Sequence, residues 1–216
     1  MSHAPGAGPD PSDESVAGGA PQREIDWQGE LRRLLLVVTG SVSASDLPFW
    51  GTWMSRFAPH LEVKVLVSDA ALQFTTLPSL KARVSREVAV DSWEAHDAEA
   101  VHVTLGEWAD GVLVHPCSMN YLGMVANGLA DRPSLLTIHC AELPTVLAPA
   151  LPPGGLESVV FQRHMEALAD RRDLVVAQPI AGTSTSSPGR TAWAPALLPE
   201  CLITLDELAA KREANR

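Results

Sequence analysis

Short apolar runs that alternate with segments of helical spacing constrain the fold of this chain more than any other feature. Nearly continuous hydrophobic runs of strand length occur at Leu34–Thr39, Val63–Val67, Gly111–Val114, Thr145–Ala148 and Leu174–Ala177. Runs without polar alternation are typical of strands that are buried on both faces of a parallel sheet. Because parallel neighbours need a crossover connection, usually a helix, the pattern predicts an α/β fold with a doubly wound, Rossmann-like (flavodoxin-like) parallel sheet in a single domain.

Several helices are expected between these strands, because apolar positions recur at helical spacing or an N-cap residue precedes the run. The expected helices cover residues 48–57 with Ser45 or Asp46 as N-cap, 70–74, 119–130, 156–170, and 205–211 with Thr204 as N-cap. Two stretches leave alternatives open. Val88–Val90 is compatible with a short strand, and Ser134–Cys140 fits a helix or a strand.

Two segments lack the composition of a packed element. Residues 1–28 are rich in Gly, Pro, Ala, Ser and acidic residues, which predicts a disordered N-terminal tail and leaves 29–216 as the folded domain. Residues 178–199 are rich in Pro, Gly, Ser and Thr, which predicts a mobile loop. A loop of this length inside a compact domain is often functional.

Charge and composition argue against several classes of protein. The formal net charge of −10 argues against a nucleic-acid partner, which would need a basic footprint. The chain has no apolar run of bilayer length and no secretory signal, so we expect no membrane partner and a cytoplasmic location. The three cysteines have a spacing that fits no zinc site, so we expect no metal.

A turn with one glycine and two serines follows the first expected strand. Thr39-Gly40-Ser41-Val42-Ser43 precedes a helix, where free backbone N–H groups can receive an anion. The dinucleotide fingerprint with three glycines is absent, and this turn suits one terminal phosphate, which favours FMN over FAD or NAD. On its own, such a segment is more often only a turn.

The segment at 115–121 lies just beyond another expected strand, where open α/β sheets bind their ligands. Asn120 offers both a donor and an acceptor, although an asparagine here could instead cap the helix that follows. His102 lies upstream, and its imidazole can exchange a proton near neutral pH. A lone histidine in an apolar segment is, however, more often structural.

This segment resembles the signature of the homo-oligomeric flavin-containing cysteine decarboxylases. The family motif reads Pro-x-Ser-Ala-Asn-Thr and is followed in a helix by Ala-Asn-Gly-x-x-Asp. The chain has Pro116-Cys117-Ser118-Met119-Asn120-Tyr121 and then Ala126-Asn127-Gly128-Leu129-Ala130-Asp131. It departs from the motif at Met119 and Tyr121. The Gly-Ser turn and a histidine ahead of Trp108-Ala109-Asp110 match the family as well.

The resemblance implies roles for individual residues. His102 would handle the thiol proton of the substrate, and Asn120 would bind its carboxylate. The implied cofactor-binding residues are Gly40, Ser41, Ser43, Ser68, Phe74, Pro116, Cys117, Ser118 and Met119. The implied substrate-binding residues are Asn120, Pro149, Leu151 and Ser184. His115 stands where the family usually has a small residue and is expected to line the site. From the residues alone, the preferred interpretation is a strand-end cap at Ser68 and a core aromatic at Phe74.

A second family motif, Pro-x-Met-Asn-x-x-Met-Trp, is degenerate in this chain. Pro149 is kept, Leu151 replaces the methionine, and Pro152 stands at the asparagine position. In the family, residues 178–199 correspond to a flap over the substrate, which carries a reducing cysteine in the branch that makes coenzyme A precursors. No cysteine occurs between Cys140 and Cys201, which favours the oxidative branch.

The resemblance therefore implies FMN-dependent oxidative decarboxylation of the C-terminal cysteine of a ribosomally synthesised precursor peptide. The aminoenethiol product would serve S-(2-aminovinyl)cysteine formation in a lanthipeptide or linaridin antibiotic. We expect a homo-oligomer built from trimers, with a dodecamer favoured over a lone trimer. An apolar helix around Trp50 and Trp53 also suggests association between subunits. The alternatives are a phosphopantothenoylcysteine decarboxylase, a flavin-binding regulatory subunit without catalysis, and a flavin prenyltransferase, which would need a basic site that the sequence does not suggest.

Overall fold

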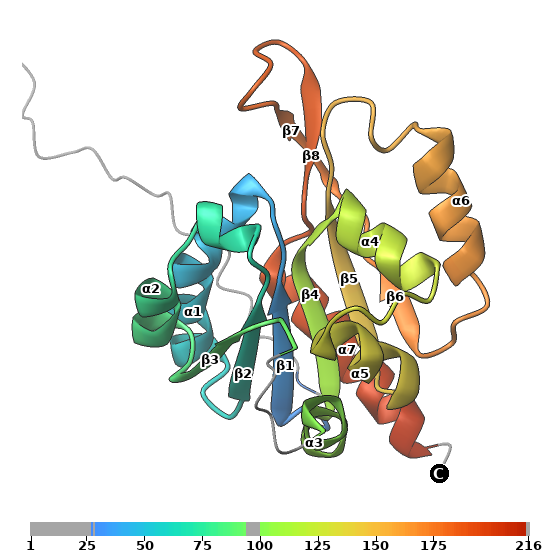
Figure 1. Cartoon of the computed structure of the whole chain (residues 1–216). Coiled ribbons are helices and arrows are strands. Elements are labelled where there is room, and N and C mark those ends of the chain that lie inside the picture. The colour runs from blue at the N-terminus through green and yellow to red at the C-terminus, as the bar shows by residue number, and fades with distance from the viewer. Residues whose placement is uncertain (1–26, 28, 94–99, 215–216) are drawn as a thin grey trace, which may run out of the picture.

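The structure is a computed structural model of the whole chain, and it describes residue 27 and residues 29–93 and 100–214 (Figure 1). The predicted tail at 1–28 lies outside the described residues apart from Trp27. The ring of Trp27 meets the ring of His60 edge-on, with centroids 4.6 Å apart.

Six parallel strands form one central sheet in the order β3-β2-β1-β4-β5-β6 (Figure 1). The strands are β1 (Arg33–Val38), β2 (Glu62–Val67), β3 (Glu87–Val90), β4 (Gly111–Ser118), β5 (Thr145–Ala150) and β6 (Leu174–Val176). The order reverses direction between β1 and β4, which makes this the topological switch point of a doubly wound sheet. The predicted fold class is confirmed, as is the short strand at Val88–Val90.

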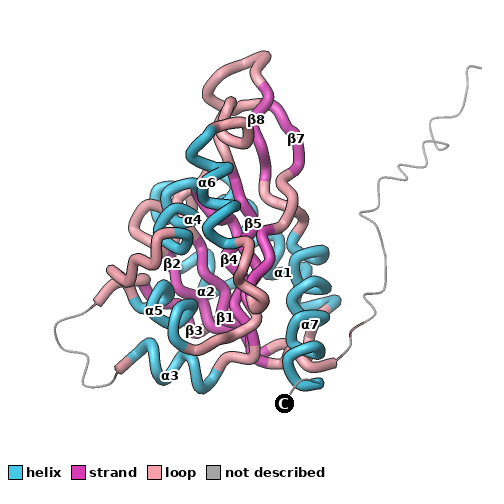
Figure 2. The backbone as a smooth tube through the Cα atoms, turned by 90° about the vertical axis from the view of Figure 1, so that its right-hand side faces the viewer, coloured by secondary structure: helices cyan, strands magenta, loops and turns pink. Residues whose placement is uncertain are grey.

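Helices cover both faces of the sheet (Figures 1 and 2). They are α1 (Leu47–Phe57), α2 (Leu77–Arg83), α3 (Val101–Trp108), α4 (Met119–Ala126), α5 (Pro133–Cys140), α6 (Val159–Leu168) and α7 (Leu198–Ala214). Helices α1, α2 and α7 contribute to one hydrophobic core, and α3, α4, α5 and α6 contribute to the other.

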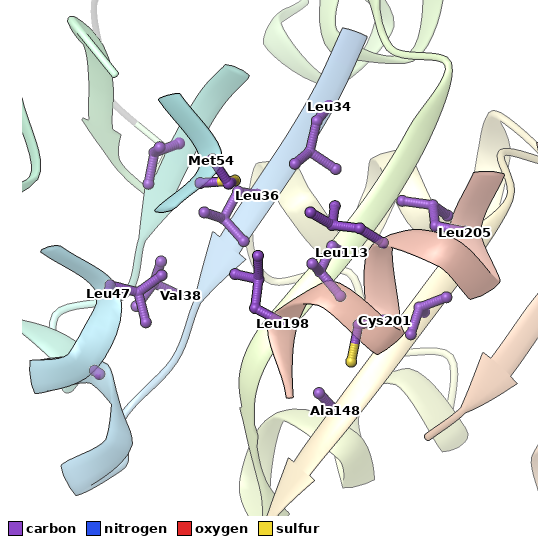
Figure 3. Packing of buried hydrophobic residues seen from close by; sticks show 14 of the residues in the cluster. Leu34, Leu36, Val38, Leu47, Met54, Leu113, Ala148, Leu198, Cys201 and Leu205 are labelled. Atoms are coloured by element: carbon purple, nitrogen blue, oxygen red, sulfur yellow. The ribbon is translucent and has the colours of Figure 1, made fainter. Parts of the chain in front are cut away.

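Strand β1 supplies both cores, because side chains alternate between the two faces of a strand. Leu34 and Leu36 belong to the core under α1 and α7, whereas Leu35 and Val37 belong to the opposite core. Figure 3 shows α7 placed over Leu113 of the neighbouring strand β4. Burial on both faces explains why these strands show no polar alternation in the sequence.

Several helix boundaries differ from the sequence prediction. Helix α7 begins at Leu198, so that Thr204 lies inside it and donates its hydroxyl to the carbonyl of Glu200 at 3.0 Å. Its first turn accommodates Pro199, whose missing N–H is not needed there, so a proline that suggested a loop in the sequence lies inside a helix. Helix α4 ends at Ala126 rather than at residue 130, because Gly128 has a φ of +67° in the left-handed region that terminates helices.

Further helical segments can be compared with the sequence prediction. Residues 134–140 form helix α5, and the expected helix at 70–74 is only a 3-10 turn at Ala71–Gln73. Helix α6 begins at Val159 and not at residue 156, because Ser158 caps it by accepting the N–H of Phe161 at 3.0 Å. Helices α2 and α3 lie in segments for which the sequence pattern predicted no helix.

An antiparallel hairpin of β7 (Ile180–Thr183) and β8 (Thr191–Ala194) extends beyond the sheet (Figures 1 and 2). The segment 178–199, predicted as a mobile loop, thus contains two short strands, and its mobility stays a prediction. All residues of β7 are exposed, so this strand needs no apolar alternation and leaves no strand signature in the sequence. Leu151 and Trp193 join the hairpin to the end of β5 through two backbone hydrogen bonds of 2.9 Å.

Candidate active site

A cavity of about 740 Å³ lies where the carboxyl ends of β1 and β4 meet. Its walls include Gly40 after β1, Ser118 at the end of β4, Leu151 after β5 and Trp193 on β8. The cavity thus occupies the switch point of the sheet, where doubly wound folds bind their ligands. Its volume lies within the range of cofactor and small-molecule sites.

The turn after β1 lies close to the segment that follows β2. A Cβ atom on Gly40 would lie only 2.5 Å from the Cβ atom of Ala70, so this position requires glycine. The Ser41 side chain caps the 3-10 helix Val42–Asp46 by accepting the N–H of Ser43 at 3.4 Å. The turn therefore places Ser41 and Ser43 at the cavity, and serine hydroxyls can donate hydrogen bonds to a phosphate.

Thr39 connects this turn to the signature segment. Its buried hydroxyl donates to the carbonyl of Pro116 and accepts the N–H of Ser118, both at 2.7 Å. The two chain segments that form the floor of the cavity are thus held in one arrangement. Sequence reasoning missed this role, because a threonine at the end of a strand carries no signal for a contact with residues far along the chain.

Asn120 is the second residue of α4 and borders the cavity with an exposed side chain. The helix is capped by Ser118, whose hydroxyl accepts the N–H of Tyr121 at 3.3 Å. The alternative that Asn120 is the helix cap is therefore wrong. Within the described part of the chain no hydrogen bond engages its amide, so its donor and acceptor are available to a ligand.

A buried polar chain supports α4 from below. The hydroxyl groups of Tyr121 and Ser134 lie 2.6 Å apart, and Ser134 donates its N–H and its hydroxyl to the carboxylate of Asp91. Burial raises the pKa of Asp91 and that of Tyr121. These hydrogen-bonded side chains link the end of β3 to the first turns of α5 and α4. The sequence did not indicate this network.

The structure brings together many of the residues predicted for the site. Those that border the cavity are Gly40, Ser41, Ser43, Ser118, Met119, Asn120, Leu151 and Ser184. Ser184 also shapes the hairpin turn, since its hydroxyl accepts the N–H of Ser187 at 3.0 Å. Trp193 and Asp46 border the cavity as well, and sequence reasoning did not identify either as a site residue.

Other predicted cofactor and substrate residues do not border the cavity of a single chain. Ser68 is buried and accepts the N–H of Ala71 at 3.3 Å, which is the strand-end cap that the sequence alone also allowed. Phe74 is 41% exposed rather than part of a core. Pro116 and Pro149 lie within β4 and β5, and burial strongly raises the pKa of the Cys117 thiol, which keeps it protonated.

His115 faces away from the cavity, so the expectation that it lines the site is wrong. It follows Leu113 by two residues in β4 and therefore shares the face covered by α7. Its Nε2 lies 2.9 Å from the carbonyl oxygen of Ala196, while its Nδ1 has no partner among the described residues. Burial lowers the pKa of His115 to about 4, so the ring is neutral at pH 7 and donates to Ala196.

His102 is the second residue of α3, the helix that leads into β4. The expectation that His102 and Asn120 lie at neighbouring strand ends is therefore wrong. The ring of His102 meets the ring of Trp93 edge-on, with centroids 5.8 Å apart, and Thr137 donates to its carbonyl oxygen at 3.3 Å. Within one chain, the cavity does not include the predicted catalytic imidazole.

Among the described residues that border the cavity, Asp46 is the only one with a charged side chain. An anion in the cavity would therefore be held by amides and hydroxyls of this chain rather than by lysine or arginine. The described residues include no group of side chains that could hold a metal ion. In the same part of the chain, no helix is long and apolar enough to span a membrane.

The chain is similar in sequence and fold to several known proteins. Residues 25–195 match the family model described as Flavoprotein. The chain is 30% identical over 151 residues to a cypemycin cysteine dehydrogenase (decarboxylating) from Streptomyces sp, covering 69% of this chain and 78% of that protein. It is 27% identical over 162 residues to a probable phosphopantothenoylcysteine decarboxylase from Arabidopsis thaliana, covering 73% and 79% of the two chains. The crystal structure of the FMN-dependent cysteine decarboxylase SpaF superposes with a TM-score of 0.69 and 27% identity, covering 82% of this chain and 97% of SpaF.

Proposed function

The chain belongs to the Flavoprotein family, and from this membership we propose an FMN-dependent oxidative decarboxylation of the C-terminal cysteine of a ribosomally synthesised precursor peptide. The product is an aminoenethiol for S-(2-aminovinyl)cysteine formation in antibiotic biosynthesis. One observation carries the proposal: the switch-point cavity joins the turn at Gly40 to the amide of Asn120, in a chain similar to decarboxylases that act on cysteine.

The residues of the cavity fit FMN. Gly40 allows the close approach of the turn, and Ser41 and Ser43 would hold the phosphate together with backbone amides. Ser118 and Met119 border the same cavity and would contact the flavin. The chemistry that bound FMN supplies is the two-electron oxidation of the cysteine at the carbon that bears the thiol.

The side chain of Asn120 would bind the substrate carboxylate. Its amide is exposed to the cavity at the N-terminus of α4, where the helix dipole also favours a negative charge. Leu151 and Trp193 border the same cavity and would limit access of water to the bound carboxylate. Holding the carboxylate in one orientation aligns the carbon–carbon bond that breaks, which lowers the entropy cost of reaching the transition state.

His102 would handle the thiol proton, and in our proposal it reaches the cavity of a neighbouring subunit. A homo-oligomer built from trimers, as in a dodecamer, provides such a neighbour. Exposed aromatic side chains on α1 support association: Phe49 is 61% exposed, and its ring centroid lies 5.2 Å from that of Trp50. We also place the reaction in the cytoplasm, because a precursor peptide is released there by the ribosome.

The coenzyme A alternative is disfavoured by the hairpin. The segment between Cys140 and Cys201 contains no cysteine, so the hairpin at the cavity has no thiol that could return electrons. A regulatory subunit without catalysis is disfavoured because both His102 and Asn120 are present.

The decisive experiment incubates the FMN-loaded protein with synthetic peptides that end in cysteine. Mass spectrometry should detect the loss of carbon dioxide plus two hydrogens. Peptides that end in serine or in an amidated cysteine are the controls and should not change. Turnover of phosphopantothenoylcysteine with loss of carbon dioxide alone, and no turnover of the peptides, would replace our proposal with the coenzyme A alternative.

A further inference from the structure

We propose that Trp93 is a positioning residue that sets the orientation of the His102 imidazole. The inference deepens the proposed function and rests on it, because it takes His102 as the group that meets the thiol of the substrate. Trp93 follows β3, whereas His102 lies near the start of α3. The two rings have centroids 5.8 Å apart and planes inclined at 81°. These values are typical of an edge-to-face aromatic pair.

The polar surroundings of His102 do not fix the ring. The hydroxyl of Thr137 on α5 is shared between the carbonyls of Pro133 at 3.0 Å and His102 at 3.3 Å, so the contact with His102 involves only the main chain of α3. The Nδ1 atom of His102, by contrast, is hidden from solvent and has no hydrogen-bond partner among the described residues. Active histidines are usually oriented by a hydrogen bond to the second ring nitrogen. In this structure the contact with Trp93 takes the place of that hydrogen bond.

Among the described residues, Trp93 packs against neither hydrophobic core, so core packing does not explain its position. The side chain is 44% exposed. The ring of Trp108, on the same helix as His102, is instead packed against the core and lies 4.5 Å from the ammonium group of Lys64. Because Trp93 supports no core, its substitution should leave the fold and the FMN content intact.

The test compares Trp93→Leu with Trp93→Phe. Leucine removes the aromatic ring, and phenylalanine keeps an aromatic face toward His102. Misplacing a catalytic group by about an ångström can cost up to 10²-fold, so Trp93→Leu should lower kcat for a cysteine-ended peptide by about 10- to 100-fold with little change in KM. Trp93→Phe should recover most of that loss. Val103→Ala changes an exposed neighbour of His102 on α3 and is the matched control with parental kcat.

A second measurement does not depend on turnover. Carbethoxylation of histidines by diethyl pyrocarbonate, followed by peptide mapping, should be faster at His102 in Trp93→Leu and close to the parental rate in Trp93→Phe. His60 and His139 are internal references and should react at unchanged rates. Parental kcat in Trp93→Leu, an unchanged rate at His102, or a general rise at all histidines would overturn the proposal. If the parental protein fails to decarboxylate peptides, the proposed function fails, while the modification rates still test the contact between Trp93 and His102.

Discussion

Acid stability depends on His115, whose ring is buried and neutral in the folded protein. Protonation would place a charge in the core and would add a second donor at Nδ1, which has no partner among the described residues. Burial accordingly lowers the pKa of His115 to about 4. In the unfolded chain the same imidazole takes up a proton near its ordinary pKa of about 6.5.

The sign and the size of the effect follow from this difference. Between the two pKa values the unfolded state binds more protons than the folded state, so stability is lost as the pH falls. The contribution of His115 is fully present above about pH 6.5 and is lost as the pH falls through about 4. Each unit of pKa corresponds to about 1.4 kcal/mol, so the expected loss is about 3 kcal/mol. Asp91 acts in the opposite direction, because burial raises its pKa.

A matched variant separates His115 from the other titrating groups. In His115→Gln the side-chain amide can still donate to Ala196, but it cannot titrate. We expect the free energy of unfolding of the parental protein to fall by about 3 kcal/mol more than that of His115→Gln between pH 7 and pH 4. Urea titrations at fixed protein and FMN concentration measure this difference. A difference that stays constant across this pH range would refute the reasoning.

Three further predictions test the site. His102→Asn and Asn120→Asp should each lower the rate of decarboxylation by about 10²- to 10⁴-fold. Co-expression of the two variants should restore activity in a peptide assay, because a mixed oligomer would contain sites with both parental residues; no recovery would contradict a histidine supplied by a neighbouring subunit. Tyr121→Phe removes the hydroxyl paired with Ser134 and should lower the free energy of unfolding by about 1–3 kcal/mol in urea titrations; an unchanged midpoint would argue against the buried polar chain. Gly40→Ala places a methyl group against the Cβ atom of Ala70 and should abolish FMN retention, measured by absorbance; a variant that still copurifies with FMN would disprove the close approach.

Local patterns accounted for the sheet and for much of the cavity. The apolar runs predicted the strands, because strands buried on both faces contain few polar residues. The turn at Gly40 and the segment around Asn120 were recognisable because the residues of each are contiguous in the chain. The hairpin at 180–194 was not recognisable, because its first strand is fully exposed and carries no apolar alternation.

The sequence by itself determined the α/β class, the parallel sheet and the two segments that meet at its switch point. The tertiary structure decided which side chains face the cavity. His115 turns toward α7 because its position in β4 shares the face of Leu113. His102 lies on α3 rather than at a strand end, and its ring contacts Trp93. Thr39 acquired its role through hydrogen bonds to residues far along the chain. Such contacts depend on how separate elements pack, and no local pattern of residues records that packing.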